Sequence, residues 1–320
     1  MRTEGSLPVK ILKLEIEGFR SLANVIWEPG DLNVLIGPNA SGKSNVLRLL
    51  EMLSASAIGR LGKYVQDEGG IEPIVWDGRT DAITIRMKTS PIDANRTSRD
   101  DVTYEVVMER LGQTSAYRIN YELLGNFYHK DRGDKDQPFK FLERAHHHAV
   151  VFDDQEHALV APPESVPEAE TLLSAAAGPF FANDVAPRFQ KQVASWRIHH
   201  DLNLQRGSAI RQSSVSRRET VVDQDGQNLI NVLHTLYTDR RDFKYEVDSA
   251  MKAAFGEEYE ELVFAPAADQ RIQLRLRWKS LQREQSAADL SDGTLRFLFL
   301  LAVFANPTPP HLCWQLTNLN

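Results

Sequence analysis

The chain has 320 residues, of which 42% are hydrophobic and 25% are charged, and this composition is typical of a globular protein with a sizeable core. Its longest uncharged apolar run, residues 297–305, is well short of the roughly 20 residues that cross a bilayer, so no membrane contact is expected. A single cysteine, Cys313, excludes an internal disulfide, and the first residues lack the apolar core of a signal peptide, which indicates a cytoplasmic protein. The net charge of −7 argues against binding of nucleic acid through overall charge.

The first part of the chain predicts short strands followed by a helix. Apolar and polar residues alternate over residues 12–16, and residues 32–36 form a compact apolar run, so both stretches are expected to be strands. From residue 42 to about residue 57 the period becomes helical. The apolar face of this expected helix is formed by Val46, Leu47, Leu50 and Leu53.

The middle of the chain alternates between apolar and polar side chains and predicts antiparallel strands separated by polar turns. These expected strands are Ala82–Arg86, Val102–Met108 and Tyr117–Leu123. Helical periodicity returns in the last third of the chain. There we expect helices over Gln227–Tyr237, Tyr245–Phe255 and Thr294–Phe304, and a strand over Arg271–Lys279.

The strongest motif is GPNASGKS, which fits the pattern G-x-x-x-x-G-K-[ST] between an expected strand and an expected helix. Its residues are Gly37, Pro38, Asn39, Ala40, Ser41, Gly42, Lys43 and Ser44, which we call the phosphate loop. Glycines allow backbone N–H groups to approach an anion, and the helix N-terminus favours negative charge. Lys43 would add a positive charge, and the Ser44 hydroxyl would be a ligand of Mg²⁺. The alternative is a glycine-rich turn without a ligand.

A second glycine motif, Ser291-Asp292-Gly293, stands at the start of the last expected helix; we call it the signature turn. As structure alone it predicts a good helix N-cap. A hydroxyl, backbone donors and a helix dipole at one point also form a site for a phosphate group. Both interpretations remain open from the residues themselves.

Together these motifs resemble those of the RecF/SMC-like ATP-binding heads, which are ABC-type proteins grouped with AAA-type predicted ATPases. The likeness starts at Phe19-Arg20-Ser21 before the phosphate loop, continues through GGIEPIVWDG and DGQNLINVLHTLY, and ends with LSDGTLRFLFLLAVFANPTPP. The resemblance implies an α/β fold of the P-loop NTPase class, of ABC/SMC-head type, with a mixed central sheet and an adjoining antiparallel β lobe. We therefore expect residues 1–80 to hold the N-terminal strands, the phosphate loop and the first helix, residues 81–165 the antiparallel β lobe, and residues 166–320 the remainder of the head.

The resemblance further implies ATP and Mg²⁺ as ligands and a homodimer of heads, in which each phosphate loop faces the signature turn of the other copy. It also implies an acidic Walker B strand directly after the proline-rich turn, yet no Asp or Glu follows Asp292. We therefore expect a chain that is truncated before Walker B, with no catalytic residue to assign. The stretch VVFDD, residues 150–154, imitates that motif but precedes the signature turn, so an ordinary strand end is expected there.

Two other polar groups were weighed as sites. Three adjacent histidines, residues 146–148, would point to alternating faces of a strand, so a solvated turn is expected rather than a metal site. The basic face of the strand over Arg271–Lys279, together with arginines in the acid-free stretch 202–218, could contact DNA, and the alternative is a solvated face with salt-bridge partners.

The sequence thus predicts an ATP-binding head, and the resemblance implies that complete relatives couple hydrolysis to head pairing and serve in DNA repair or defence. A second hypothesis is a nucleotide-binding or interaction protein that does not hydrolyse ATP, because carboxylates for Mg²⁺ and water are missing after Asp292. A third is a truncated product without a stable function.

Overall fold

The computed structural model describes the following parts of the chain: residues 9–38, 41–76, 80–92, 101–112, 114–126, 138–162, 165–178, 183–199, 202–307 and 313–315. The chain divides into two compact units, Met1–Trp196 and Arg197–Asn320, which we call unit 1 and unit 2. The helix that follows the phosphate loop belongs to unit 1, and the helix that follows the signature turn belongs to unit 2.

Unit 1 is built on an antiparallel sheet of eight strands in the order β2-β1-β3-β4-β5-β6-β7-β8. The strands are β1 (Ile11–Phe19), β2 (Leu22–Trp27), β3 (Ala82–Thr89), β4 (Val102–Arg110), β5 (Tyr117–Asn126), β6 (Phe139–Ala145), β7 (His148–Asp153) and β8 (Ala158–Val160). Apolar residues alternate along the strands, as in Ile83, Ile85 and Met87 of β3, which are fully buried. The N-terminal strands and the predicted antiparallel lobe therefore form one continuous sheet.

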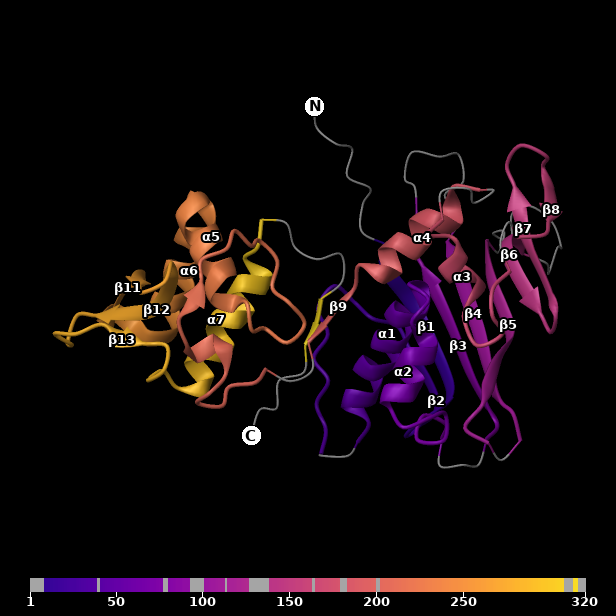
Figure 1. Cartoon of the computed structure of the whole chain (residues 1–320), viewed down its shortest axis with the longest axis horizontal. Helices are drawn as coiled ribbons and strands as arrows, with labels where there is room; N and C mark the ends of the chain where they lie inside the picture. Colours follow the sequence, from indigo (N-terminus) through magenta and orange to yellow (C-terminus); the bar gives the residue numbers. More distant parts are fainter. Residues whose placement is uncertain are drawn as a thin grey trace. The chain divides into compact units, whose positions relative to one another are not determined.

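Four helices lie along this sheet (Figure 1). They are α1 (Lys43–Ala57), α2 (Leu61–Asp67), α3 (Leu172–Ala175) and α4 (Val185–Ala194). Helix α1 packs against the other three, and α3 and α4 contact β6. Leu49, Leu50 and Leu53 of α1 are almost completely buried, and each such side chain contributes about 1.5–3 kcal/mol of stabilisation.

The apolar run before the phosphate loop is not a strand in the structure. Between Trp27 and the phosphate loop the described residues contain no helix or strand. Leu32 is 81% exposed and Ile36 is 90% exposed, whereas a strand of a central sheet would bury both. The predicted strand is thus wrong for this structure, because no described strand pairs with the segment and supplies its hydrogen bonds.

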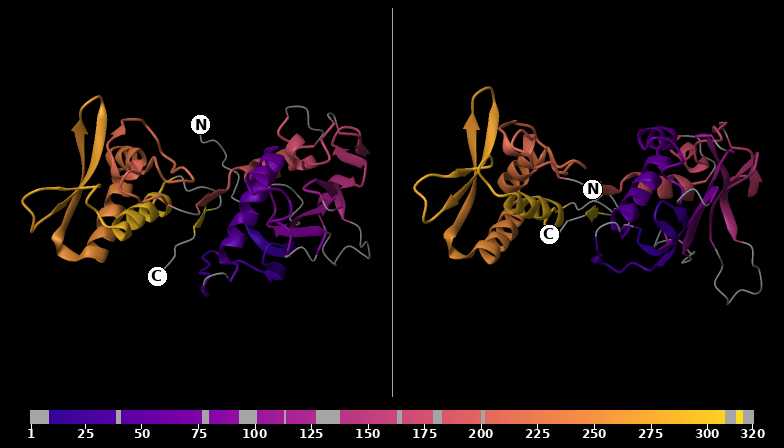
Figure 2. Two further views of the ribbon diagram at one scale, coloured as in Figure 1. Left: turned by 60° about the horizontal axis from the view of Figure 1, so that its bottom comes forward. Right: turned by 90° about the horizontal axis from the view of Figure 1, so that it is seen from below.

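Unit 2 packs three helices around a small antiparallel sheet. The helices are α5 (Leu229–Asp239), α6 (Arg241–Phe255) and α7 (Asp292–Phe304), with the short turns η2 (Ala209–Arg211) and η3 (Gly256–Glu258). The sheet has the order β10-β12-β11, formed by β10 (Ser214–Val215), β12 (Arg271–Trp278) and β11 (Tyr259–Ala267), and β13 (Gln285–Ser286) pairs with β12. A parallel pair, β9 (Arg197–His199) with β14 (Cys313–Gln315), completes the unit (Figure 2).

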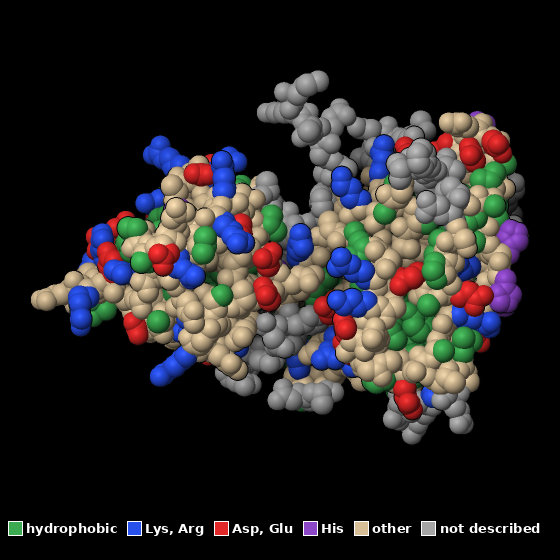
Figure 3. Space-filling view, viewed as in Figure 1, with side chains coloured by type: hydrophobic (Ala, Val, Ile, Leu, Met, Phe, Trp, Pro, Cys, Tyr) green, Lys and Arg blue, Asp and Glu red, His purple; other side chains and the backbone are tan. Residues whose placement is uncertain are grey.

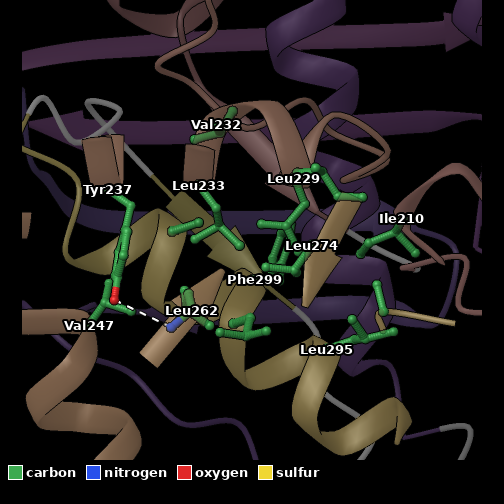
Figure 4. Close-up of a cluster of buried hydrophobic side chains, with 14 of the residues drawn as sticks. Ile210, Leu229, Val232, Leu233, Tyr237, Val247, Leu262, Leu274, Leu295 and Phe299 are labelled. Carbon is green, nitrogen blue, oxygen red and sulfur yellow. Dashed lines mark hydrogen bonds between the residues drawn. The ribbon is translucent and has the colours of Figure 1, made fainter. Parts of the chain in front are cut away.

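The core of unit 2 is formed where α5, α7 and the β11–β12 hairpin meet (Figure 4). Leu233, Leu274 and Leu295 are fully buried in it, and the backbone N–H of Leu262 donates to the Tyr237 hydroxyl at 3.3 Å. The predicted α/β class is confirmed, with a large antiparallel sheet beside helices. None of the helices in the described ranges has both the length and the apolar composition needed to cross a membrane.

Candidate functional site

The phosphate loop leads directly into α1, the helix that the 3.6-residue period predicted. Gly42 precedes the helix in a left-handed conformation, with φ of 92°, and its carbonyl accepts from Asn45 N at 2.9 Å. Among the described residues, the N-terminus of α1 has no side-chain cap, and its first turn carries no acidic residue. The positive end of this helix dipole is therefore not neutralised by the helix itself, which favours an anion there.

Lys43 folds back over the loop that precedes it. Its Nζ donates to the carbonyl oxygens of Gly37 at 2.7 Å and Pro38 at 2.8 Å, and it lies 3.4 Å from Ser41 Oγ. The Ser41 N–H donates to the same Pro38 carbonyl at 3.3 Å and tightens the turn. These contacts hold the ammonium group over the loop. Asn39 and Ala40, which we also predicted as binding residues, lie outside the described residues.

Two glycines of the phosphate loop lie close to serine side chains. A Cβ on Gly37 would lie 3.0 Å from Ser41 Oγ, and a Cβ on Gly42 would lie 2.7 Å from Ser21 Oγ. The distance at Gly42 is shorter than real Cβ contacts, and its φ of 92° strains any other residue, whereas at Gly37 the Ser41 hydroxyl would have to shift slightly. The narrow loop, the lysine and the uncapped helix fit a phosphate group.

Ser21 is a residue of the site that sequence reasoning did not assign. It belongs to the turn between β1 and β2, and its Oγ accepts from Asn45 Nδ2 at 2.8 Å. The preceding residue, Arg20, has φ of 48°, donates its N–H to the Ile74 carbonyl at 2.7 Å, and pairs through its guanidinium with Glu68. The Phe19-Arg20-Ser21 element of the resemblance thus contacts the end of the phosphate loop and the first turn of α1 through Ser21. The element pointed to Ser21, but nothing in the sequence indicated that its hydroxyl would contact Asn45, which lies 24 residues later.

Ser44 is the predicted ligand of Mg²⁺. It lies in the first turn of α1 and is partly exposed. No group of three or more His, Cys, Asp or Glu side chains within the described ranges could hold a metal ion. Ser44 could therefore supply one oxygen to a Mg²⁺ ion that arrives with the oxygens of a bound phosphate.

The signature turn begins α7, as its N-cap pattern predicted. Ser291 is in an extended conformation, and its Oγ accepts from Thr294 N at 3.1 Å. Leu295 N donates to the Ser291 carbonyl at 3.1 Å, and the Leu295 side chain is fully buried. The N-cap interpretation is confirmed by these bonds. A role in phosphate binding stays a prediction.

A buried arginine holds this turn, and sequence reasoning did not assign it. Arg211 ends η2 and is one of several arginines in the acid-free stretch 202–218. Its side chain is 6% exposed and forms an ion pair with Asp292 of the signature turn. Arg218, in the same stretch, is exposed and instead pairs with Asp239 at 3.1 Å, so the buried Arg211 does not share a basic surface with it.

The basic face of β12 is neutralised by neighbouring carboxylates. Arg277 pairs with Glu261 and with Glu284, and Lys279 lies 3.3 Å from Glu257. The hydrogen bond between Arg277 and Glu284 raises the pKa of the arginine and lowers the pKa of the carboxyl. Acidic side chains are interspersed with basic ones on the visible face of unit 2 (Figure 3). These pairs supply the salt-bridge partners that the alternative of a solvated face predicted, and the choice between that alternative and DNA binding stays untested.

The histidine run and the VVFDD stretch are structural features. His146 and His147 form the turn between β6 and β7, and His147 Nδ1 lies 3.0 Å from Glu168. Asp153 ends β7, and its Oδ1 accepts from Gln155 N at 2.7 Å and Glu156 N at 3.0 Å. Both predictions are confirmed: a solvated turn and an ordinary strand end.

Comparison with known proteins places these motifs in context. A family model described as "AAA domain, putative AbiEii toxin, Type IV TA system" matches residues 32–315, a range that includes the phosphate loop and the signature turn. The chain is similar to a solved structure described as the SmcHead bound to the C-winged helix domain of ScpA, with 14% identity, a TM-score of 0.43, and coverage of 92% of this chain and 76% of that one.

It is also similar to a structure described under ATP-driven dimerization and DNA stimulated activation of SMC ATPases, with 21% identity, a TM-score of 0.25, and coverage of 34% of this chain and 69% of that one. A search of curated proteins gave no match.

Proposed function

The chain belongs to the AAA-domain family whose model it matches over residues 32–315, and from this premise we propose that it binds ATP with Mg²⁺ as one head of a pair. The resemblance to ABC-type AAA heads that its motifs predicted agrees with this family. The proposal assigns the β- and γ-phosphates of ATP to the phosphate loop.

One observation carries the proposal: the position of Lys43. Its Nζ donates to the carbonyls of Gly37 and Pro38, so the charge is held over the loop at the uncapped N-terminus of α1. Charged hydrogen bonds of this kind are stronger than neutral ones. An ammonium group, a helix N-terminus and glycine backbone donors at one point favour a polyphosphate over a neutral ligand.

The second half of the proposal concerns pairing. We propose that the ATP held by the phosphate loop of one copy is met by Ser291 and the first N–H groups of α7 of the other copy. ATP is then shared between two copies of the chain, and its release separates them. Support comes from the chemistry of the turn, in which a hydroxyl stands at the start of a 13-residue helix.

Hydrolysis is a separate step that needs a carboxylate to orient water. Residues 293–320 contain neither Asp nor Glu, so none of them is proposed as the carboxylate that orients water. Rapid hydrolysis is proposed only for an assembly in which another polypeptide or segment supplies the carboxylates. A role in DNA repair or defence rests on the resemblance alone.

Binding of a fluorescent ATP analogue with Mg²⁺ tests the proposal. Lys43→Ala should weaken the affinity about tenfold to a hundredfold, because a charged hydrogen-bonding group is removed. Lys63→Ala is the matched control, since Lys63 is an exposed lysine on α2 in the same unit, and it should bind like the wild type. Equal binding by Lys43→Ala and the wild type would refute the proposed site.

A further inference from the structure

The buried side chain of Arg211 makes several hydrogen bonds to the segment around the signature turn. Its Nε donates to the Leu204 carbonyl at 2.7 Å. Its Nη1 donates to the carbonyls of Ala287 at 3.2 Å, Ala288 at 3.3 Å and Leu290 at 2.6 Å, and its Nη2 donates to Asp292 Oδ1. All three guanidinium nitrogens are therefore used, and most of the bonds go to residues 287–292.

This network fixes the shape of the segment that precedes α7. Leu290, whose carbonyl receives the shortest of the carbonyl bonds, stands directly before the Ser291 cap. Ile210, next to Arg211, is completely buried in the core of unit 2 (Figure 4), so the arginine starts from a rigid position. A planar guanidinium can satisfy several acceptors in one fixed geometry, which a flexible ammonium group cannot.

The network also affects the charge of the turn. The Asp292 side chain is 66% exposed and stands in the first turn of α7, where an unpaired carboxylate would repel a phosphate group. Its ion pair with Arg211 offsets that charge. Arg211 is itself buried, so it reaches no ligand directly and acts only through its neighbours.

We infer that Arg211 is the positioning residue of the signature turn: it fixes residues 287–292 and offsets the charge of Asp292, so that Ser291 and the helix N-terminus can receive the γ-phosphate of ATP. This inference rests on the proposed function, because it takes the turn to meet ATP bound by a second copy.

The test compares Arg211→Gln, Asp292→Asn and the double variant in sedimentation velocity with saturating ATP and Mg²⁺. Arg211→Gln should weaken ATP-dependent pairing at least tenfold, because Asp292 is left uncompensated. Asp292→Asn should pair within about threefold of the wild type, and adding it to Arg211→Gln should restore pairing in part. In all variants the fluorescent ATP analogue should bind the phosphate loop as in the wild type.

A merely structural role gives different results. It predicts no recovery in the double variant, and that outcome, or wild-type pairing by Arg211→Gln, would overturn the inference. Arg211→Lys covers the case in which Arg211→Gln does not fold, since it keeps the positive charge. It should pair about fivefold more weakly than the wild type, because one ammonium group cannot reach the carbonyls and Asp292 together. Wild-type pairing by Arg211→Lys would then overturn the inference.

Hydrogen exchange supplies a second readout without ATP. Arg211→Gln should exchange faster over residues 287–296 but not over α5, and unchanged exchange in both segments would overturn the inference. Failure of the proposed function looks different: a wild type that stays monomeric at saturating ATP refutes the pairing and with it the phosphate role of Arg211. A wild type that pairs no better than Arg211→Gln refutes only the inference.

Discussion

The phosphate loop of unit 1 and the signature turn of unit 2 are both glycine-containing turns at the start of a helix, but they are held in different ways. The phosphate loop is shaped mostly by its own residues, since Lys43 bonds the carbonyls of Gly37 and Pro38. The signature turn depends on Arg211, which stands about 80 residues away in the sequence, with a separation of 81 from Asp292. The comparison teaches that a turn can be locally encoded as a motif and still need a distant residue to hold its shape.

The largest loss of ATP binding is expected from Gly42→Ala, which changes a residue of the phosphate loop itself. The new Cβ would stand 2.7 Å from Ser21 Oγ at a residue with φ of 92°, so both packing and backbone are strained. Strain of this kind costs on the order of 1–3 kcal/mol, and binding of the ATP analogue should fall by at least tenfold. Gly112→Ala is the matched control, because Gly112 also has positive φ but a Cβ there meets nothing within 4 Å. Equal ATP binding by both variants would show that the loop does not depend on this contact.

The next largest effect is expected from Ser21→Ala. This change removes the oxygen that accepts from Asn45 and that leaves no room for a Cβ on Gly42. Loss of one hydrogen bond should cost about 0.5–1.5 kcal/mol of stability, measured by denaturant unfolding. Combined with Gly42→Ala, it should cost less than the sum of the two single changes, because the clashing atom is gone. Strict additivity would contradict the assignment of Ser21 as the support of the loop.

Glu122 is a buried titratable residue of unit 1, and unlike Arg211 it should make the stability of the protein depend on pH. The Glu122 carboxylate is fully buried and accepts from Leu172 N at 2.5 Å, from Leu173 N at 2.8 Å and from the Tyr104 hydroxyl at 3.0 Å. Burial raises its pKa above the usual value of 4.5, against the opposing effect of these donors and of Arg144. A guanidinium, in contrast, keeps its charge over the pH range in which proteins fold.

The folded state therefore holds the Glu122 proton more tightly than the unfolded state does. The contribution of Glu122 to stability is fully present below about pH 4.5 and is lost as the pH rises through the raised pKa. In urea unfolding at a series of pH values, Glu122→Gln should remove this part of the pH dependence. A wild type and a variant with parallel pH profiles would contradict it.

The smallest effect is expected on the basic face of β12. Arg277→Ala removes a cation that Glu261 and Glu284 already neutralise. Surface ion pairs contribute little to stability, so the melting temperature and the ATP affinity should stay close to those of the wild type. Binding of DNA by gel shift should also be unchanged if this face is a solvated one. A clear loss of DNA affinity would favour the DNA surface over the salt-bridge interpretation.

Elements with a strong period were predictable from the sequence, because local apolar patterns decide them. Helices α1 and α7 and strand β12 begin within two residues of their predicted starts. The strand predicted at residues 32–36 is absent from the structure, because a short apolar run becomes a strand only where another strand pairs with it. Ile36 shows this most clearly, as it is 90% exposed in the structure.

The same reasoning explains the two halves of the site. Lys43 and Ser291 could be found because each stands inside a motif of fixed spacing. The contacts of Ser21 and Arg211 could not be found, although Ser21 stands in the Phe19-Arg20-Ser21 element, because their partners Asn45 and Asp292 are set by the packing of the chain and not by local order. Residues that position a motif are therefore less visible in a single sequence than the motif itself.

The central claim is that the phosphate loop of one copy and the signature turn of another share ATP. Mixing two variants that cannot pair by themselves tests it most directly. Lys43→Ala copies lack a working loop, and Arg211→Gln copies lack a positioned turn, so neither should pair alone with ATP and Mg²⁺. An equal mixture assembles one complete site, from the loop of the second variant and the turn of the first. We predict that heterodimers appear in this mixture by native mass spectrometry, and a mixture that stays monomeric while the wild type pairs would contradict the account.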